Sequence, residues 1–241
     1  MSTSHLRDPH ALTEAEIERI EKLCLRVLYQ AVVDFGFEAH DVFRQSTDDE
    51  KDVAEDITRE LLDRIGGYQI EQRVFGNVDY RKARYVVLPE FLVRQALFVD
   101  SKAEKDAASA TIQMSQTSMR IHQLRSGIIM EETGLLRPVS EFNGIQFLTT
   151  TMLAHYHYAR ANGVNNLFGV TMVAIPNGKL QDLYNPDANT TIWRAGRNAP
   201  TRGESFRVRI DFTRLRAVSA WRVQAVSYDP TTRRINFGWV D

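Results

Sequence analysis

The sequence has a single cysteine, Cys24, among its 241 residues, so it cannot form an internal disulfide. This excludes the disulfide-rich scaffolds of small secreted proteins and is typical of chains from a reducing cytosol. Long apolar runs are also missing, since none approaches the roughly 20 residues of a membrane-spanning helix, and no signal peptide is visible. We therefore expect a cytoplasmic protein that has no membrane partner.

Lysine is scarce, because six lysines stand beside 24 arginines in a chain of net charge −1. The charge is uneven: residues 14–63 carry fifteen acidic and six basic residues, whereas residues 194–234 carry ten arginines and three acidic residues. Planar guanidinium groups suit phosphates and guanine edges. A solvated basic face would explain the same asymmetry, so a polyanionic partner is predicted only together with a matching site.

Internal repeats and low-complexity segments are absent from the sequence, and its 43% hydrophobic and 25% charged residues are ordinary for a globular protein. The length allows one large domain or two small ones. We expect residues 1–12 to form a flexible tail and residues 13–241 to form a single domain.

Two helices are predicted near the N-terminus. A capping box from Thr13 to Glu16 opens the first, and its apolar stripe of helical period ends near Gly36. Cys24 lies on this stripe, which favours a buried, inert thiol. A second capping box, residues 47–50, opens a helix that carries Glu55 on one side of its apolar stripe. Periodicity alone does not select Glu55 as a functional residue.

The segment from residue 74 to residue 102 carries the strongest chemical signal. It predicts a strand, a turn and a second strand, which bring Asp79, Asp100 and Lys102 to one point at a sheet edge. Asp100 and Lys102 are two apart, so their side chains share a face, while the backbone carbonyl of Ser101 can also face a metal. Carboxylate oxygens are the ligands that Mg²⁺ prefers, and an amine can orient water or neutralise a phosphate. The segment predicts metal-assisted phosphodiester hydrolysis.

The Asp-x-Lys triplet is a common pattern, and residues 49–51 form a second copy in an acidic stretch that looks helical. The apolar strand that precedes Asp100, and an acid about twenty residues upstream across one hairpin, favour the Asp100 copy.

Several later segments stay open on pattern alone. The small, polar residues 107–117 fit a helix start or a loop close to bound DNA, and residues 119–145 have no clear assignment. Strands are predicted at 149–158 and 167–175. His155 and His157 share a strand face with the spacing of a two-ligand metal site, but no third ligand is evident and core histidines are favoured.

Arginines recur in the C-terminal third. Arg197 and Arg202 lie in a loop that either contacts a DNA groove or simply covers the surface. From Phe206 to Phe212 the residues alternate, which predicts a strand with Arg207 and Arg209 on its polar face and residues 221–228 as its partner. The arginine pair fits guanine readout or a cross-strand ion pair with Asp211 or a neighbour.

Several short segments in a specific order resemble the SfiI family of type II restriction endonucleases, within the PD-(D/E)XK superfamily, over roughly residues 15–228. The segments are Ala54–Thr58, Val78–Tyr80, Val99–Ala103, Tyr184–Asp187, Arg202–Glu204, Arg207–Arg209 and Trp221–Arg222. The resemblance implies an α/β fold with a restriction-endonuclease-like core, in which helices flank a mixed β-sheet. It also implies Mg²⁺-dependent cleavage of both strands of duplex DNA at an interrupted palindrome, leaving 5′-phosphates.

Carried over residue by residue, the resemblance makes Asp79 and Asp100 metal ligands, Lys102 the catalytic lysine and Glu55 a helix-borne acid near the metal. The DNA-binding candidates are Lys105, Ser109, Arg197, Arg202, Arg207 and Arg209. The expected partners are double-stranded DNA, further copies of the chain in a homodimer or homotetramer, and a separately encoded DNA methyltransferase of a prokaryotic host.

The segment after Lys102 is less basic than in the family, which leaves the recognition sequence open. A DNA-binding protein without catalysis and a structure-specific nuclease are the alternative functions. A digest of DNA in Mg²⁺ separates the three functions. Discrete bands indicate a restriction endonuclease, a smear indicates a structure-specific nuclease, and binding without cleavage indicates a non-catalytic DNA-binding protein.

Overall fold

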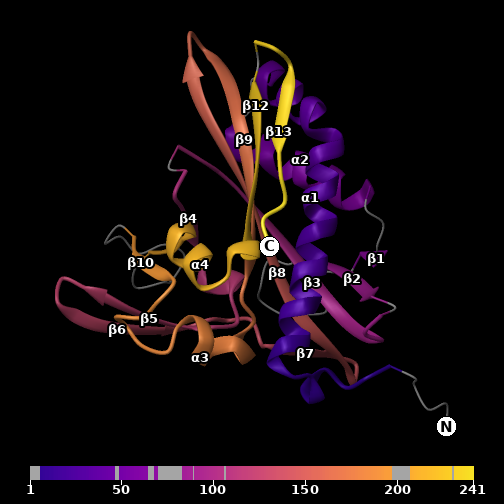
Figure 1. The fold of residues 1–241 in the computed structure, drawn as a ribbon, viewed down its shortest axis with the longest axis vertical. Helices are drawn as coiled ribbons and strands as arrows, with labels where there is room; N and C mark the ends of the chain where they lie inside the picture. Colours follow the sequence, from indigo (N-terminus) through magenta and orange to yellow (C-terminus); the bar gives the residue numbers. More distant parts are fainter. Residues whose placement is uncertain are drawn as a thin grey trace.

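The computed structural model describes residues 6–46, 49–64, 68–69, 83–88, 90–105, 107–196, 207–229 and 231–241. A mixed β-sheet forms its centre, with two long helices on one face and a smaller sheet with short helices on the other (Figure 1). The α/β fold class predicted from the sequence is confirmed. Within the described residues, no helix is long and apolar enough to cross a membrane.

The helices are α1 (Glu14–Gln45), α2 (Glu50–Arg64), α3 (Gln181–Tyr184) and α4 (Phe212–Val218), with 3-10 turns at η1 (Pro9–Ala11), η3 (Met114–Gln116), η4 (Gly178–Leu180) and η5 (Ala220–Arg222). The strands are β1 (Tyr68–Gln69), β2 (Ala83–Leu88), β3 (Val93–Glu104), β4 (Ser109–Ile112), β5 (Arg120–Arg125), β6 (Ile128–Thr133), β7 (Val139–Phe142), β8 (Ile145–Ala161), β9 (Val164–Ile175), β10 (Trp193–Ala195), β11 (Val208–Asp211), β12 (Val223–Asp229) and β13 (Arg234–Phe237).

The central sheet has the strand order β1-β2-β3-β8-β9-β12-β13, and β7 also pairs with β8. Strands β3 and β8 are parallel, whereas β2 with β3 and β8 with β9 are antiparallel hairpins. The predicted strands at 149–158 and 167–175 are confirmed within β8 and β9. Because β3 lies beside the long β8, its C-terminal end is held rigidly inside the sheet rather than at a loose margin.

Helix α1 begins as predicted, with the capping box between Thr13 and Glu16 formed in both directions. The predicted end near Gly36 is wrong, because the helix continues to Gln45. A Cβ atom on Gly36 would lie 2.6 Å from Cε1 of Tyr228 on β12. Glycine therefore serves close packing of a strand side chain against the helix here, and it does not mark a helix end.

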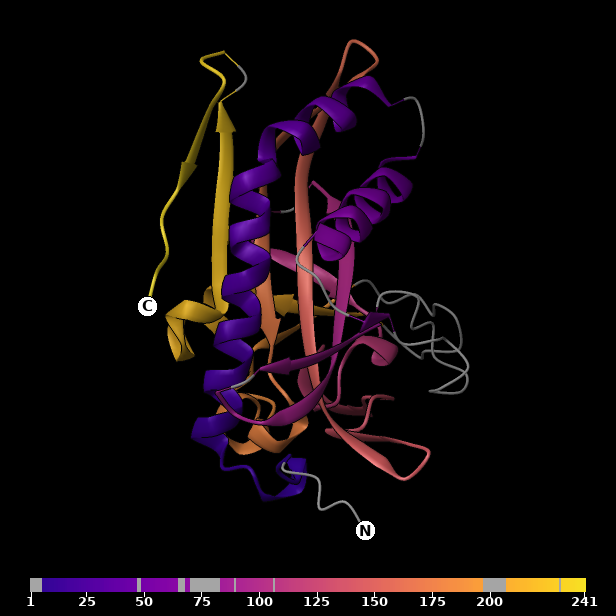
Figure 2. The same ribbon diagram turned by 90° about the vertical axis from the view of Figure 1, so that its right-hand side faces the viewer.

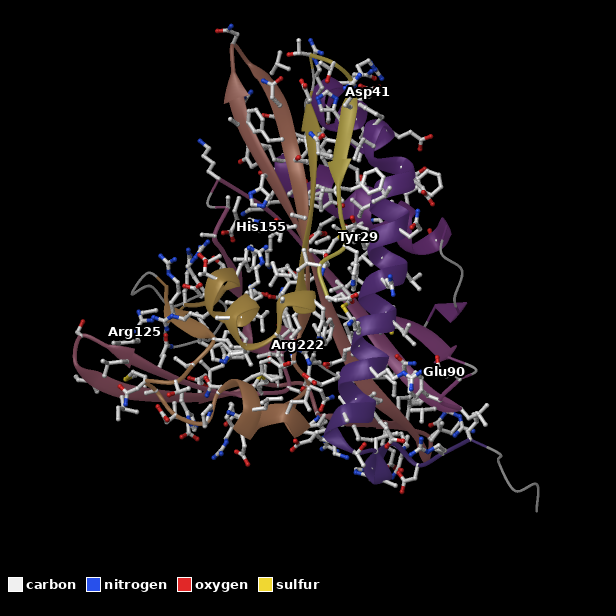
Figure 3. The ribbon with its side chains drawn as sticks, viewed as in Figure 1. Tyr29, Asp41, Glu90, Arg125, His155 and Arg222 are labelled. Carbon is white, nitrogen blue, oxygen red and sulfur yellow. The ribbon has the colours of Figure 1, made fainter. Side chains whose placement is uncertain are left out.

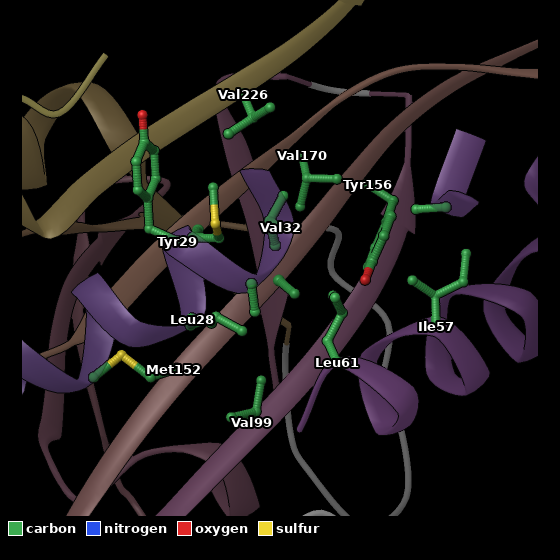
Figure 4. Close-up of a cluster of buried hydrophobic side chains, with 14 of the residues drawn as sticks. Leu28, Tyr29, Val32, Ile57, Leu61, Val99, Met152, Tyr156, Val170 and Val226 are labelled. Carbon is green, nitrogen blue, oxygen red and sulfur yellow. The ribbon is translucent and has the colours of Figure 1, made fainter. Parts of the chain in front are cut away.

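Helices α1 and α2 pack side by side on one face of the sheet (Figure 2). Asp49 accepts a hydrogen bond from the Lys51 N–H at 2.9 Å at the start of α2, while the predicted capping residue Thr47 lies outside the described residues. The core between helices and sheet is apolar (Figure 4) and combines Leu28 and Val32 of α1, Ile57 and Leu61 of α2, and Val99, Met152, Tyr156, Val170 and Val226 of the strands.

The opposite face carries a small antiparallel sheet of order β10-β11-β4. Residues 109–112 are thus a strand, so the expected helix start or loop is wrong there. The predicted partner of 206–212 is also wrong, because β12 pairs with β9 and β13 instead. The reason is Asp211, whose side chain accepts hydrogen bonds from the N–H groups of Thr213 and Arg214 and starts α4 at Phe212. The alternating pattern therefore ends in a helix before the chain returns to the central sheet.

Residues 120–133, which had no clear assignment, form the antiparallel hairpin β5–β6 that projects from the body of the protein (Figure 1). A second core joins this side of the molecule to the sheet and to the start of α1, and it includes Ile17, Leu153, Trp193 and Ile210. Within the predicted tail, residues 9–11 form η1 and Leu12 is buried in this second core.

Candidate active site

Strand β3 places its alternating side chains in two different environments. Leu97 and Val99 pack into the core under α1 and α2. Asp100, Lys102 and Glu104 lie at the alternate positions and so project from the opposite face, toward the small sheet. The apolar run therefore anchors the strand, and its last residues deliver one acid, one amine and a second acid on a single face.

Asp100 and Lys102 form an ion pair, with Lys102 Nζ 3.0 Å from Asp100 Oδ2. Both side chains are mostly buried, with 18% and 20% of their surface exposed. The second Asp-x-Lys triplet differs, because Asp49 caps an exposed helix start. The two copies of one pattern therefore have separate roles, and only the Asp100 copy forms a pair at the end of a buried strand.

The other predicted members of the site are placed less directly. Asp79 lies outside the described residues. Ser101 is buried on the face of β3 opposite to Asp100, which leaves only its backbone for a ligand role. Glu55 lies on the exposed side of α2, and α2 covers the face of β3 that carries Val99.

A hydrogen-bonded group lies next to the Asp100–Lys102 pair. Glu104 Oε2 accepts from Arg209 Nη2 at 2.6 Å, and Glu104 Oε1 accepts from the Thr111 N–H at 3.1 Å. Arg209 also donates from Nε to Ser109 Oγ at 2.8 Å and from Nη1 to Thr111 Oγ1 at 2.9 Å. Arg209 thus forms an ion pair, but with Glu104 of the central sheet and not with the predicted Asp211, and the buried Ser109 is engaged within the protein.

The remaining DNA-binding candidates are spread over the same side. Lys105 is exposed directly after β3, and Arg207 is half-buried at the start of β11. Arg125 donates to the carbonyl oxygens of Arg207 at 3.0 Å and Gly196 at 3.1 Å, which joins β5 to both flanks of the segment 197–206. Arg197 and Arg202 belong to that segment and lie outside the described residues.

The two histidines are structural parts of the interior. His155 is fully buried with its ring edge-on to Phe212 at 5.4 Å, and its Nδ1 lies 3.1 Å from His157 Nε2. Thr171 Oγ1 lies 2.9 Å from the same His157 nitrogen. Figure 3 shows His155 in the interior and Arg125 at the side of β5 and β10. The preference for core histidines over metal ligands agrees with this placement.

Sequence reasoning missed Glu104 and Arg125. Glu104 continues the alternation of Asp100 and Lys102 on one strand face, so its position could have been found from the spacing. Arg125 carries no such signal, because its partners are backbone carbonyls brought in from β10 and β11 by tertiary folding.

A Mg²⁺ ion needs oxygen ligands and keeps several of its waters. The partly open Asp100 carboxylate and the Ser101 carbonyl fit this chemistry. No group of three or more His, Cys, Asp or Glu side chains suited to a metal ion occurs among the residues that the structure describes. The described donors fit one side of a magnesium site, and waters and substrate phosphate oxygens are the usual remaining ligands of this ion.

Solved structures define the class of protein. The crystal structure of tetrameric restriction endonuclease SfiI bound to cognate DNA matches with a TM-score of 0.86 and 29% identity, covering 98% of this chain and 93% of that chain. Restriction endonuclease BglI bound to its DNA recognition sequence shares the fold, with a TM-score of 0.71, 16% identity and coverage of 88% and 90%. The fold is that of restriction endonucleases.

Sequence comparison then gives the family. The family model for type II restriction enzyme SfiI matches residues 31–226. The type II restriction enzyme SfiI of Streptomyces fimbriatus is 30% identical over an alignment of 250 residues. The alignment covers 98% of this chain and 93% of that protein. The chain belongs to the SfiI family of type II restriction enzymes, and the resemblance stated from the sequence is confirmed.

Proposed function

We propose that this protein is a Mg²⁺-dependent type II restriction endonuclease that cuts both strands of duplex DNA at an interrupted palindrome and leaves 5′-phosphates. The observation that carries the proposal is the Asp100–Lys102 pair, partly exposed at the end of a buried strand. A family match over residues 31–226 supports the same chemistry.

Asp79 and Asp100, with the Ser101 carbonyl, would hold the ion. Strand β2 supports this assignment, because Ala83 lies opposite Phe98 in the antiparallel pair. Asp79 precedes Ala83 by four positions, and four residues span at most about 14 Å of extended chain. This length allows Asp79 to meet Asp100, as the proposal requires. When bound, the ion would polarise the scissile phosphate and make its coordinated water more acidic.

Lys102 acts from the same strand face as Asp100. Its ammonium group would orient the attacking water and neutralise the charge that builds on the phosphate in the transition state. Glu55 is the weaker member of the proposed site, because it is exposed on α2 and α2 covers the other face of β3.

DNA would be held by basic groups around the small sheet, with Lys105 and Arg207 at its surface and Arg197 and Arg202 in the adjoining segment. A palindromic site requires at least a two-fold dimer, since protein symmetry mirrors DNA symmetry. SfiI is a tetramer on its DNA, so we propose a homodimer or homotetramer. We place the enzyme in the cytoplasm of a prokaryote, with a separately encoded methyltransferase that protects host DNA.

The proposal is tested by digesting genomic DNA with the protein in Mg²⁺ and sequencing the fragment ends. We expect one recurring interrupted palindrome, a constant overhang and ends that ligate through their 5′-phosphates. Ends without a shared sequence would favour a structure-specific nuclease. Sequence-specific binding in a gel shift, with no cleavage in Mg²⁺ or Mn²⁺, would favour a DNA-binding protein without catalysis.

A further inference from the structure

We propose that the Glu104–Arg209 ion pair is a positioning device that couples DNA docking on the β10–β11–β4 sheet to the Asp100–Lys102 site. The inference rests on the proposed nuclease function and adds a role for two residues in it. Glu104 is a positioning residue in this view, and Arg209 acts through it rather than by reading bases.

The first support is the way Glu104 is used. Its two carboxylate oxygens are bonded to different strands of the small sheet, one to Arg209 of β11 and the other to the backbone of Thr111 in β4. Glu104 itself belongs to β3 of the central sheet. A single carboxylate therefore joins three strands and two sheets, and it does so through a charge-assisted bond of 2.6 Å.

Arg209 is equally committed to the protein. Its Nε donates to the Ser109 hydroxyl and its Nη1 to the Thr111 hydroxyl. Its Nη2 donates both to the Glu104 carboxylate and to the Ser109 carbonyl. Only 19% of the side chain is exposed. A guanidinium that reads guanine needs its fork directed at the base edge, whereas this fork is directed at β3 and β4.

The pair is mechanically close to the chemistry. Glu104 is two residues beyond Lys102 on the same strand face, so a shift of the end of β3 moves both side chains together. His155 of β8 also holds the end of β3. It lies opposite Lys102 in the parallel pair of strands, and its Nε2 lies 4.0 Å from Glu104 Oε2. The end of β3 is thus held by β8 beside it and by Arg209 above it.

In the proposed function, the groups that meet DNA lie at the other end of the connection. Arg194 of β10 lies opposite Arg209 in the small sheet, and Arg207 lies two residues before it. Arg125 fixes the backbone of Arg207 and Gly196 at the margin of this sheet. Strain applied to this sheet by a bound duplex would therefore reach Lys102 through Arg209 and Glu104.

The test uses Glu104→Gln, which keeps the size of the side chain and one carbonyl acceptor but removes its charge. The affinity for the cognate site is measured in Ca²⁺, and the single-turnover cleavage rate is measured in Mg²⁺ at saturating enzyme. We expect affinity close to the wild type and a cleavage rate lower by about a hundredfold, the loss expected when a reacting group moves by roughly an ångström. Preference for the cognate site over a site with one base changed should also fall.

Arg209→Gln should reproduce this pattern, and the double variant should be no slower than either single variant, because both changes break one connection. If Glu104→Gln fails to fold, Arg209→Gln carries the test alone, because it breaks the same connection from the other side and should show the same separation of rate from affinity.

The matched control is Glu18→Gln. Glu18 of α1 is also a partly exposed glutamate paired with an arginine, since its Oε1 lies 3.3 Å from Arg222 Nη2 and 30% of its side chain is exposed, but it lies away from β3. It should lower the melting temperature and leave the cleavage rate unchanged. A folded Glu104→Gln protein that cleaves at the wild-type rate, or that loses only affinity, would overturn the inference. An equal rate loss in the control would also overturn it. Absence of cleavage by the wild-type protein would instead overturn the proposed function, and the inference with it.

Discussion

Arg222 and Glu21 form the most deeply buried ion pair among the described residues, with Nη2 2.7 Å from Oε2 and neither side chain exposed. Glu21 also accepts a hydrogen bond from the Asn177 N–H at 2.9 Å, and Arg222 Nε donates to the Tyr184 hydroxyl at 2.6 Å. Burial raises the pKa of the Glu21 carboxyl, and Arg222 opposes that rise. The pair joins α1 to the loop after β9 and to η5.

Replacing Arg222 with Met should leave Glu21 as an uncompensated buried charge and should cost about 3–5 kcal/mol of stability at neutral pH. The raised pKa gives the sign of the pH dependence. Below the ordinary value of 4.5, Glu21 is protonated in both states and the deficit is smallest. The deficit should grow as pH rises above the folded-state pKa of Glu21 in the wild type, because from there on only the wild type compensates the ionised carboxylate.

Urea unfolding of both proteins from pH 4 to pH 8 measures this deficit. The double variant with Glu21→Gln serves as the control, because it should recover much of the lost stability and flatten its dependence on pH. A deficit independent of pH would contradict the role given to Glu21.

At the scale of the element, Gly36 of α1 packs directly against Tyr228 of β12. The Tyr228 ring occupies the space where a side chain at position 36 would project. Alanine in place of Gly36 should therefore destabilise the protein by about 1–3 kcal/mol, as overpacking does, although alanine is the better helix former.

The same change in a Tyr228→Ala background should be neutral or should stabilise by up to about 1 kcal/mol, because the helix preference is then no longer opposed. A double-mutant cycle followed by denaturant unfolding gives the coupling between the two positions. Additive effects would show that the two elements do not press on each other at this point.

Elements also show which parts of the fold the sequence predicts. The start of α1, the Asp100 strand and the burial of Cys24 depend on local spacing, and the structure confirms all three. Burial raises the pKa of the Cys24 thiol to about 12, which agrees with an inert role. The continuation of α1 past Gly36 reflects packing against Tyr228 of β12, and the end of β11 is set by the cap at Asp211. Local periodicity encodes neither of these contacts.

The candidate site divides in the same way. Alternation along one strand was enough to place Asp100 and Lys102 together. The bonding of Arg209 was not predictable, because Glu104 is 105 positions away in the chain and the two meet only when the small sheet packs on β3. Two arginines on one strand face therefore looked alike in sequence, although Arg209 is tied to Glu104 and Arg207 is held through its backbone.

At the scale of the whole molecule, two bodies of structure meet at the end of β3. The central sheet under α1 and α2 supplies the Asp100–Lys102 pair, and the small sheet with its arginines lies directly beside it (Figure 1). In the function that we propose, sequence recognition and phosphodiester hydrolysis are carried by separate sheets that join at one strand. This arrangement requires that Asp100 serve the chemical step and contribute little to holding the DNA.

That requirement is tested most directly by Asp100→Ala, with the exposed Asp182→Ala on α3 as the matched control. Cleavage of a plasmid that bears the mapped site is followed in Mg²⁺, and binding of a short duplex with the same site is followed in Ca²⁺. We expect no detectable cleavage by Asp100→Ala with specific binding retained, and wild-type behaviour of the control. Cleavage by Asp100→Ala at the wild-type rate would contradict it.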